Sequence, residues 1–153
     1  MPYRITVDDL TGPDIAALLQ EHVDEMRRIS PPESKHALDL DGLRHPDITL
    51  WTLHDGDTLL GCGALKQLTP TTAEIKSMRT ATAAQRRGVA STLLTHLITE
   101  ARSRGYTTLY LETGTDPFFQ PARTLYERFG FTRCEPFADY RPDPNSTHLS
   151  RTL

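Results

Sequence analysis

Apolar and polar residues follow two different periods along this chain. In several short stretches, apolar residues recur at every second position, which is typical of half-buried strands. In two longer stretches they recur at every third or fourth position, as on the buried face of an amphipathic helix. Strands are therefore predicted at residues 3–7, 48–54, 58–67, 72–80 and 107–111, with extended structure from 131 and a last edge strand at 148–153. Helices are predicted at residues 14–28, 89–104 and 121–129, with a short helical turn at 38–44.

Turn-forming residues separate these elements. Asp55-Gly56-Asp57 is typical of a β-hairpin turn. Two prolines predict a loop at residues 30–36, because proline lacks the backbone donor that a helix needs. The order strand–helix–strand over residues 72–111 favours parallel pairing through a right-handed crossover. The pattern predicts a single α/β domain over residues 1–153.

The composition narrows the class of protein. The 153 residues suit one domain, and 37% of them are hydrophobic, which is enough for a packed core. The net charge of −3 argues against bulk nucleic-acid binding, which needs a basic face. No apolar run approaches the ~20 residues of a membrane span, so a soluble, cytoplasmic protein without a membrane partner is expected. Cys62 and Cys134 lack metal-ligand spacing and are expected as small core residues, with no metal site.

The run Gln85-Arg86-Arg87-Gly88-Val89-Ala90 is the first candidate for chemistry. It follows a predicted strand and opens the helix at 89–104. The first amides of a helix have no intrahelical partner, and the helix dipole adds partial positive charge there. Such an end binds phosphate or pyrophosphate groups, and a glycine lets the backbone approach the ligand closely.

This run resembles the Gln/Arg-x-x-Gly-x-Gly/Ala signature of the GNAT family of N-acetyltransferases. A second stretch at residues 122–131, Ala-Arg-Thr-Leu-Tyr-Glu-Arg-Phe-Gly-Phe, looks like the family's Ala-x-x-Leu-Tyr-x-x-x-Gly-Phe helix. The two motifs and their flanking strands cover residues 74–131. The resemblance implies a mixed, largely antiparallel sheet with helices on both faces and one parallel strand pair that splays at an acetyl-CoA site.

The resemblance also implies which residues hold acetyl-CoA. Backbone amides at the mouth of the helix would bind the pyrophosphate, and the strand segment before it would pair with the pantetheine arm. At one position the chain departs from the family, because Phe119 stands where an asparagine often contacts CoA; this residue is expected either to touch CoA or to pack on the core. The expected cofactor-binding residues are Met78, Arg79, Thr80, Gln85, Arg86, Arg87, Gly88, Val89, Ala90, Ser91 and Phe119.

Acetyl transfer to an amine needs an acid that protonates the departing thiolate and a base that deprotonates the amine. Tyr126 matches the family tyrosine that often protonates the departing thiolate, and a phenol with a pKa of about 10 can donate a proton at neutral pH. Glu74 is the leading candidate for the base that deprotonates the amine, and Glu112 is the alternative. Direct attack then depends on holding the amine and the thioester in line. Strand alternation predicts four residues on one face: Glu74, Lys76, Met78 and Thr80.

The acceptor side is less specific in the sequence. By resemblance, Ser34, His36 and Arg44 would line it, and Arg79, Arg123 and Arg141 are candidates for binding a substrate carboxylate. We expect an acetyl-CoA-dependent N-acetyltransferase that acts on a small-molecule primary amine. A protein or peptide acceptor and a non-catalytic acyl-CoA sensor are the alternatives. Dimers are common among resembling proteins, so a homodimer is a candidate assembly.

Overall fold

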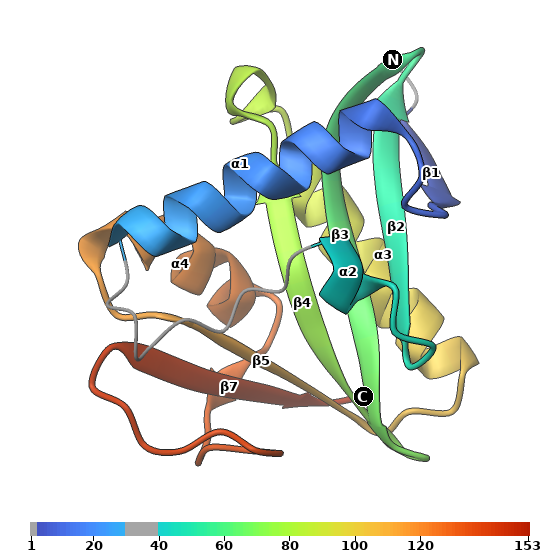
Figure 1. The fold of residues 1–153 in the computed structure, drawn as a ribbon. Helices are drawn as coiled ribbons and strands as arrows, with labels where there is room; N and C mark the ends of the chain where they lie inside the picture. The colour runs from blue at the N-terminus through green and yellow to red at the C-terminus, as the bar shows by residue number, and fades with distance from the viewer. Residues whose placement is uncertain (1–2, 30–39) are drawn as a thin grey trace.

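The computed structural model describes residues 3–29 and 40–153, which form one open seven-stranded sheet with helices on both faces (Figure 1). The strands are β1 (Arg4–Val7), β2 (Ile48–Asp55), β3 (Thr58–Thr69), β4 (Thr72–Thr80), β5 (Thr108–Gly114), β6 (Thr132–Arg133) and β7 (Ser146–Thr152). Their order in the sheet is β1-β2-β3-β4-β5-β7-β6. The helices are α1 (Pro13–Ile29), α2 (Leu40–Leu43), α3 (Val89–Ser103) and α4 (Gln120–Arg128), with short 3-10 turns at Thr82–Ala84 and Pro117–Phe119.

Most predicted elements form within a residue or two of their expected ends, and the predicted fold class is confirmed. Three details differ. β5 extends to Gly114, three residues beyond the prediction. Extended structure after Phe131 is limited to the two residues of β6. The last strand, β7, is not an edge strand: it lies between β5 and β6, because β6 pairs with its outer side.

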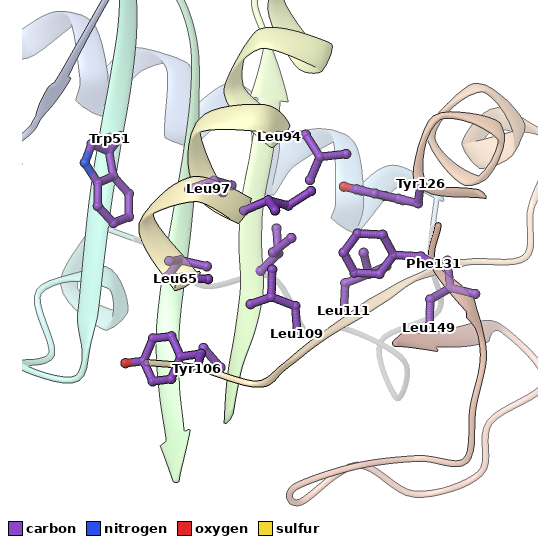
Figure 2. Close-up of a cluster of buried hydrophobic side chains, with 14 residues drawn as sticks. Trp51, Leu65, Leu94, Leu97, Tyr106, Leu109, Leu111, Tyr126, Phe131 and Leu149 are labelled. Atoms are coloured by element: carbon purple, nitrogen blue, oxygen red, sulfur yellow. The ribbon is translucent and has the colours of Figure 1, made fainter. Parts of the chain in front are cut away.

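The two faces of the sheet bury separate apolar clusters. α3 and α4 cover one face, where side chains of both helices meet the inward residues of β4 and β5 (Figure 2). α1 and α2 cover the other face, over β2 and β3. Gly61 of β3 lies beneath the start of α3, and a side chain there would meet the Arg79 carbonyl and the Val89 side chain, each at 2.8 Å. A glycine at this position therefore lets the first turn of α3 seat directly on the sheet.

β4 and β5 form the parallel pair, and they separate part of the way along. Pairing runs from Thr72 opposite Thr108 to Ile75 opposite Leu111 and then stops. Both strands continue, β4 to Thr80 and β5 to Gly114, and Figure 1 shows them diverging. The splayed pair expected from the resemblance is thus present, and it leaves backbone groups of β4 facing a gap rather than a neighbouring strand.

A β-bulge in β4 overturns one expectation from strand alternation. Between Cys62 and Ala64 of β3, the partners on β4 advance from Arg79 to Lys76, so β4 holds an extra residue. Ser77 has a φ of 54°, in the left-handed region. The bulge turns Met78 to the α3 face, against Gly63, while Lys76 stays on the face that α1 covers. The prediction that Met78 and Thr80 share a face with Glu74 and Lys76 is therefore wrong, since Thr80 pairs with Gly61, which also faces α3.

Candidate active site

The start of α3 presents free backbone donors beside the splay. Gly88 is the N-cap, with a φ of 75° and no capping side chain. The first intrahelical bond runs from the Thr92 amide to the Gly88 carbonyl at 3.0 Å, so the amides before it have no partner within the helix. An added side chain at Gly88 would meet nothing within 4 Å, which means that the space in front of these donors is open. A left-handed φ of 66° at Arg86 adds a second sharp turn to this loop.

Two contacts of Arg87, with Asp55 and with Tyr3, hold the loop before α3 in place. Arg87 forms an ion pair with Asp55 at 3.1 Å, and its carbonyl accepts a hydrogen bond from the Tyr3 hydroxyl at 2.9 Å. Gln85 and Arg86 are exposed, while Val89 is buried at the base of the helix. The loop therefore leads directly into a helix N-terminus whose first amides have no partner within the helix, and such an end favours an anionic group.

The strand segment beside the splay is anchored on both faces. Met78 packs among the side chains under α3. Arg79 points the other way and pairs with Glu21 of α1 at 2.5 Å, and the Thr82 hydroxyl donates to the same carboxylate at 2.9 Å. Thr80 is half-buried and pairs with Gly61. This part of β4 is therefore fixed by its side chains, and its backbone edge faces the gap.

Tyr126 lies in the large core cluster on the α3 side of the gap. Its side chain extends from α4 toward Leu94, and its ring meets Phe131 edge-on at a centroid distance of 5.9 Å (Figure 2). The residue is 7% exposed. Burial, and then the negative charge of Glu112, raise the pKa of the Tyr126 phenol well above its usual value. The phenol is therefore protonated at neutral pH.

Glu74 is held in a buried network on the opposite face of the sheet. The residue is 2% exposed, and one of its carboxylate oxygens binds both the Lys76 ammonium at 3.2 Å and the Tyr140 hydroxyl at 2.6 Å. Lys76 also donates to the Tyr140 hydroxyl at 3.0 Å. Burial raises the pKa of Tyr140, as does the Glu74 charge, so the phenol stays a donor. Glu74 is thus the acceptor that fixes the segment around Tyr140 to the sheet.

Glu112 lies one residue past the last paired position of β5, in the splayed part of the strand. Burial raises its pKa from 4.5 to about 7, although contact with Ser146 and the charge of Lys76 oppose the rise. The charges of Glu74 and Asp143 act in the same direction as burial. A carboxyl with a pKa near neutrality can both accept and release a proton at physiological pH, which is what a general base requires.

A cleft of about 580 Å³ opens on this face beside Glu74 and Lys76. Its far wall is the segment from Ala138 to Asn145, and Lys66 of β3 contributes to the floor. Aromatic rings support this wall: Phe137 stacks on Tyr110 at 4.8 Å and meets Tyr140 edge-on at 4.9 Å. His148 packs against Tyr140 at 5.3 Å. Sequence reasoning named only Arg141 of this wall, because its residues follow neither the strand nor the helix period.

The remaining predicted site residues lie elsewhere. Phe119 is buried, and its ring covers Gly114 at the end of β5, which is core packing; a contact with CoA stays a prediction. Arg44 donates to the Leu10 carbonyl at 2.8 Å and to Asp41 at 2.9 Å, so it links the end of α2 to the loop between β1 and α1 and does not line the cleft. Ser34 and His36 lie outside the described residues.

A parallel strand pair that separates beside the uncapped N-terminus of α3 is the arrangement expected for an acyl-CoA-dependent transferase. The sequence profile of the acetyltransferase (GNAT) family matches residues 15–131. The chain therefore belongs to the GNAT family; it is an acetyl-CoA-dependent N-acyltransferase with acetyl-CoA as co-substrate.

Similar proteins extend over the whole chain. The chain is 54% identical over 150 residues to the uncharacterized N-acetyltransferase YsnE of Bacillus subtilis, with 98% of this chain and 99% of that protein covered. It is 34% identical over 141 residues to an IAA acetyltransferase of Azospirillum brasilense, with 91% and 90% covered. The fold matches a GNAT acetyltransferase from Elizabethkingia anophelis solved with acetyl-CoA bound, at a TM-score of 0.74 and 20% identity, with 99% and 98% covered. Within the described part of the chain, no helix combines the length and apolar character needed to cross a membrane.

Proposed function

We propose that this enzyme transfers the acetyl group of acetyl-CoA to the primary amine of a small molecule in the cytoplasm, by direct attack. The observation that supports a small acceptor is the cleft of about 580 Å³ on the face opposite α3. Its wall is held against the sheet through the hydrogen bond from Tyr140 to Glu74, which gives the cleft one defined side. A volume of this size suits a small ligand, whereas a protein chain would need a groove open at both ends.

In this proposal, the donor is held by backbone groups. The amides of Val89, Ala90 and Ser91 bind the pyrophosphate, with Gly88 leaving room for its approach. The guanidinium of Arg86, which is exposed at the same loop, adds positive charge. The unpaired edge of β4 at Met78–Thr80 binds the pantetheine amides, which aligns the thioester with the gap.

We place the base at Glu112 rather than at Glu74. Glu74 already accepts hydrogen bonds from Lys76 and Tyr140 on one oxygen, so its carboxylate is engaged within the protein. Glu112 lies in the splay itself, and its charge is felt by Tyr126 on the other side. Glu74 then acts as a positioning residue that keeps the cleft wall in place.

The proton and bond changes balance as follows. Glu112 takes a proton from the substrate ammonium, and the freed nitrogen attacks the acetyl carbonyl. The new C–N bond forms as the C–S bond breaks, and Tyr126 donates its proton to the leaving sulfur. The phenol regains a proton from the nitrogen, so the products are the N-acetyl amine, CoA and one proton.

The test is thiol release from acetyl-CoA with three acceptor sets: small amines, amino acids and peptides with free N-termini. Small amines or amino acids that release thiol while the peptides do not support the proposal. Turnover of peptides alone would favour a protein acceptor. Binding of acetyl-CoA by calorimetry with no thiol release from any set would favour the sensor and refute the proposal.

A further inference from the structure

Three arginines are candidates for binding a substrate carboxylate. In two of them the guanidinium is already bound to other groups of the protein. Arg79 has an 11% exposed side chain and pairs with Glu21 at 2.5 Å. Arg123 donates to the Gly114 carbonyl at 2.6 Å and to the Asp116 carbonyl at 3.2 Å, so it closes the turn between β5 and α4. Both guanidinium groups therefore have internal structural partners.

Arg141 differs from these two because it lines the cleft and is exposed. Lys66 lines the same cleft from the strand β3, where it pairs in register with Glu74. Within residues 3–29 and 40–153, neither Arg141 nor Lys66 has a hydrogen-bond or ion-pair partner. Two cations that approach one cleft from different elements are thus available to a ligand.

The other charges of the cleft are largely used within the protein. Lys76 is neutralised by Glu74 at 3.2 Å. The Asp143 carboxylate accepts the Asn145 amide at 2.8 Å and shapes the turn before β7. Asp139 is the third acid of the lining, so the pairing of Lys76 with Glu74 leaves two cations, Lys66 and Arg141, and two carboxylates, Asp139 and Asp143, among the described lining residues. A cleft that presents both signs of charge fits a zwitterion better than a simple amine.

The positions of Lys66 and Glu112 also indicate which end of such a ligand lies where in the cleft. Lys66 lies in register with Glu74 and, through it, with Tyr110, two strand spacings of about 4.8 Å away; Glu112 lies two residues further along β5, so the backbones at the two ends are roughly 12 Å apart. Leu109 and Leu111 of β5 face the cluster under α3, so Glu112 faces the same side of the sheet as Glu74 and its partner Lys66. The space between them suits a compact molecule whose amine and acid groups are a few bonds apart.

We infer that the acceptor carries a carboxylate as well as the reacting amine, as an amino acid does, and that Arg141 and Lys66 bind this carboxylate while the amine faces Glu112. The inference rests on the proposed function, since it names the acceptor of that same site. Arg141 can bind the carboxylate with two parallel N–H donors, and Lys66 contributes a single point charge.

The substrate test compares acids with their neutral counterparts. Thiol release is measured with the common L-amino acids and, for each that reacts, with the carboxamide of the same amino acid. We expect a kcat/KM about 100-fold lower for the amide, mainly through KM, since each charged contact is worth about tenfold. β-Alanine and O-phosphoethanolamine separate a carboxylate from a phosphate; faster turnover of the phosphate compound would overturn the carboxylate assignment.

The variant test uses Arg141→Gln and Lys66→Gln, with Arg133→Gln on the exposed strand β6 as the matched control. Each cleft variant should reduce the acid-to-amide preference about tenfold, Arg141→Lys should restore part of it, and the control should keep it. An unchanged preference in both cleft variants, with folding verified by thermal unfolding, overturns the inference. Equal use of acids and neutral amines by the wild type refutes this inference alone, whereas no thiol release with any amine refutes the proposed function with it.

Discussion

Glu112 gives the sharpest test of the proposed chemistry, because it links activity to stability. Its pKa is about 7 in the folded protein against an ordinary 4.5, and this difference corresponds to about 3 kcal/mol. Between pH 4.5 and 7, Glu112 holds a proton in the folded state that it has lost in the unfolded state. The free energy of unfolding should therefore fall as pH rises from about 4.5 to 7, and the whole cost should be present above pH 7.

The perturbation is Glu112→Gln, which keeps the shape of the side chain and removes the charge. Relative to wild type, the variant should be equally stable below pH 4.5 and more stable by up to about 3 kcal/mol at pH 8. Its turnover should fall by about 10²–10⁴-fold, because a general base is lost. In the wild type, kcat/KM should rise with an apparent pKa near 7, and this rise should disappear in the variant.

The free energy of unfolding of Glu112→Gln must be compared with that of the wild type at each pH, because His22 makes this free energy change with pH in the opposite direction. Burial lowers the pKa of His22 from 6.5 to about 4, so its contribution to stability is lost as pH falls from 6.5 toward 4. The two slopes nearly cancel in the wild type between pH 4.5 and 6.5. Urea unfolding of each protein at half-unit steps from pH 4 to 8.5 separates them.

Glu74→Gln is the matched control, since it removes the neighbouring buried carboxylate. This variant leaves the Lys76 ammonium, which is 9% exposed, without its counter-charge, and should lose about 3 kcal/mol of stability. It should keep the Glu112 ionisation in kcat/KM, moved to lower pH because the Glu74 charge helps raise the Glu112 pKa. If Glu112→Gln retains that ionisation, or its stability difference is the same at pH 4.5 and 8, then Glu112 is not the titrating base.

Three further changes test other parts of the structure. Tyr126→Phe should lower kcat about 100-fold and leave acetyl-CoA affinity by calorimetry nearly intact, and an unchanged kcat would remove the phenol from the acid role. Gly88→Glu should abolish acetyl-CoA binding in a folded protein, while Gly88→Ala, which shares the strain of a left-handed φ, should retain measurable binding; equal binding by both would place the pyrophosphate elsewhere. Gly114→Ala should cost about 1–3 kcal/mol in urea unfolding, because its methyl group overlaps the Phe119 ring, and a neutral effect would show that the ring can move aside.

The secondary structure could be predicted from the sequence because its signals are local. The apolar spacing over residues 89–101 predicts α3, and the glycines on either side of it mark its ends. The position of Gly88 predicts an open helix N-terminus from the same few residues. The parallel pairing of β4 and β5 follows from the handedness of the connection between them, which is again a property of one contiguous segment.

The cleft could not be predicted in this way, because it depends on contacts between distant segments. Tyr140 reaches Glu74 across 66 positions of sequence, and no periodic pattern marks the segment that carries it. The sequence also gives no sign of the bulge at Ser77, because no neighbouring residue marks this serine as one that adopts a φ of 54°. Strand alternation then assigns Met78 to the wrong face. The sequence also gives no sign that Lys76 and Tyr140 bind the Glu74 carboxylate.

The gap between β4 and β5 explains how an acid and a base on opposite faces of a sheet can serve one reaction. Tyr126 belongs to the core under α3 and α4, whereas Glu112 faces the cleft wall near Ser146. In a continuous sheet, layers on the two faces are separated by about 10 Å of side chain and backbone. Here the pairing of β5 with β4 stops at Leu111, one residue before Glu112, although β5 stays paired with β7 as far as Gly114. The Glu112 charge raises the pKa of Tyr126, so the two groups interact where β4 no longer flanks β5. In the proposed reaction, an acetyl carbonyl placed in the gap would be reached by the amine from one face and by the phenol from the other.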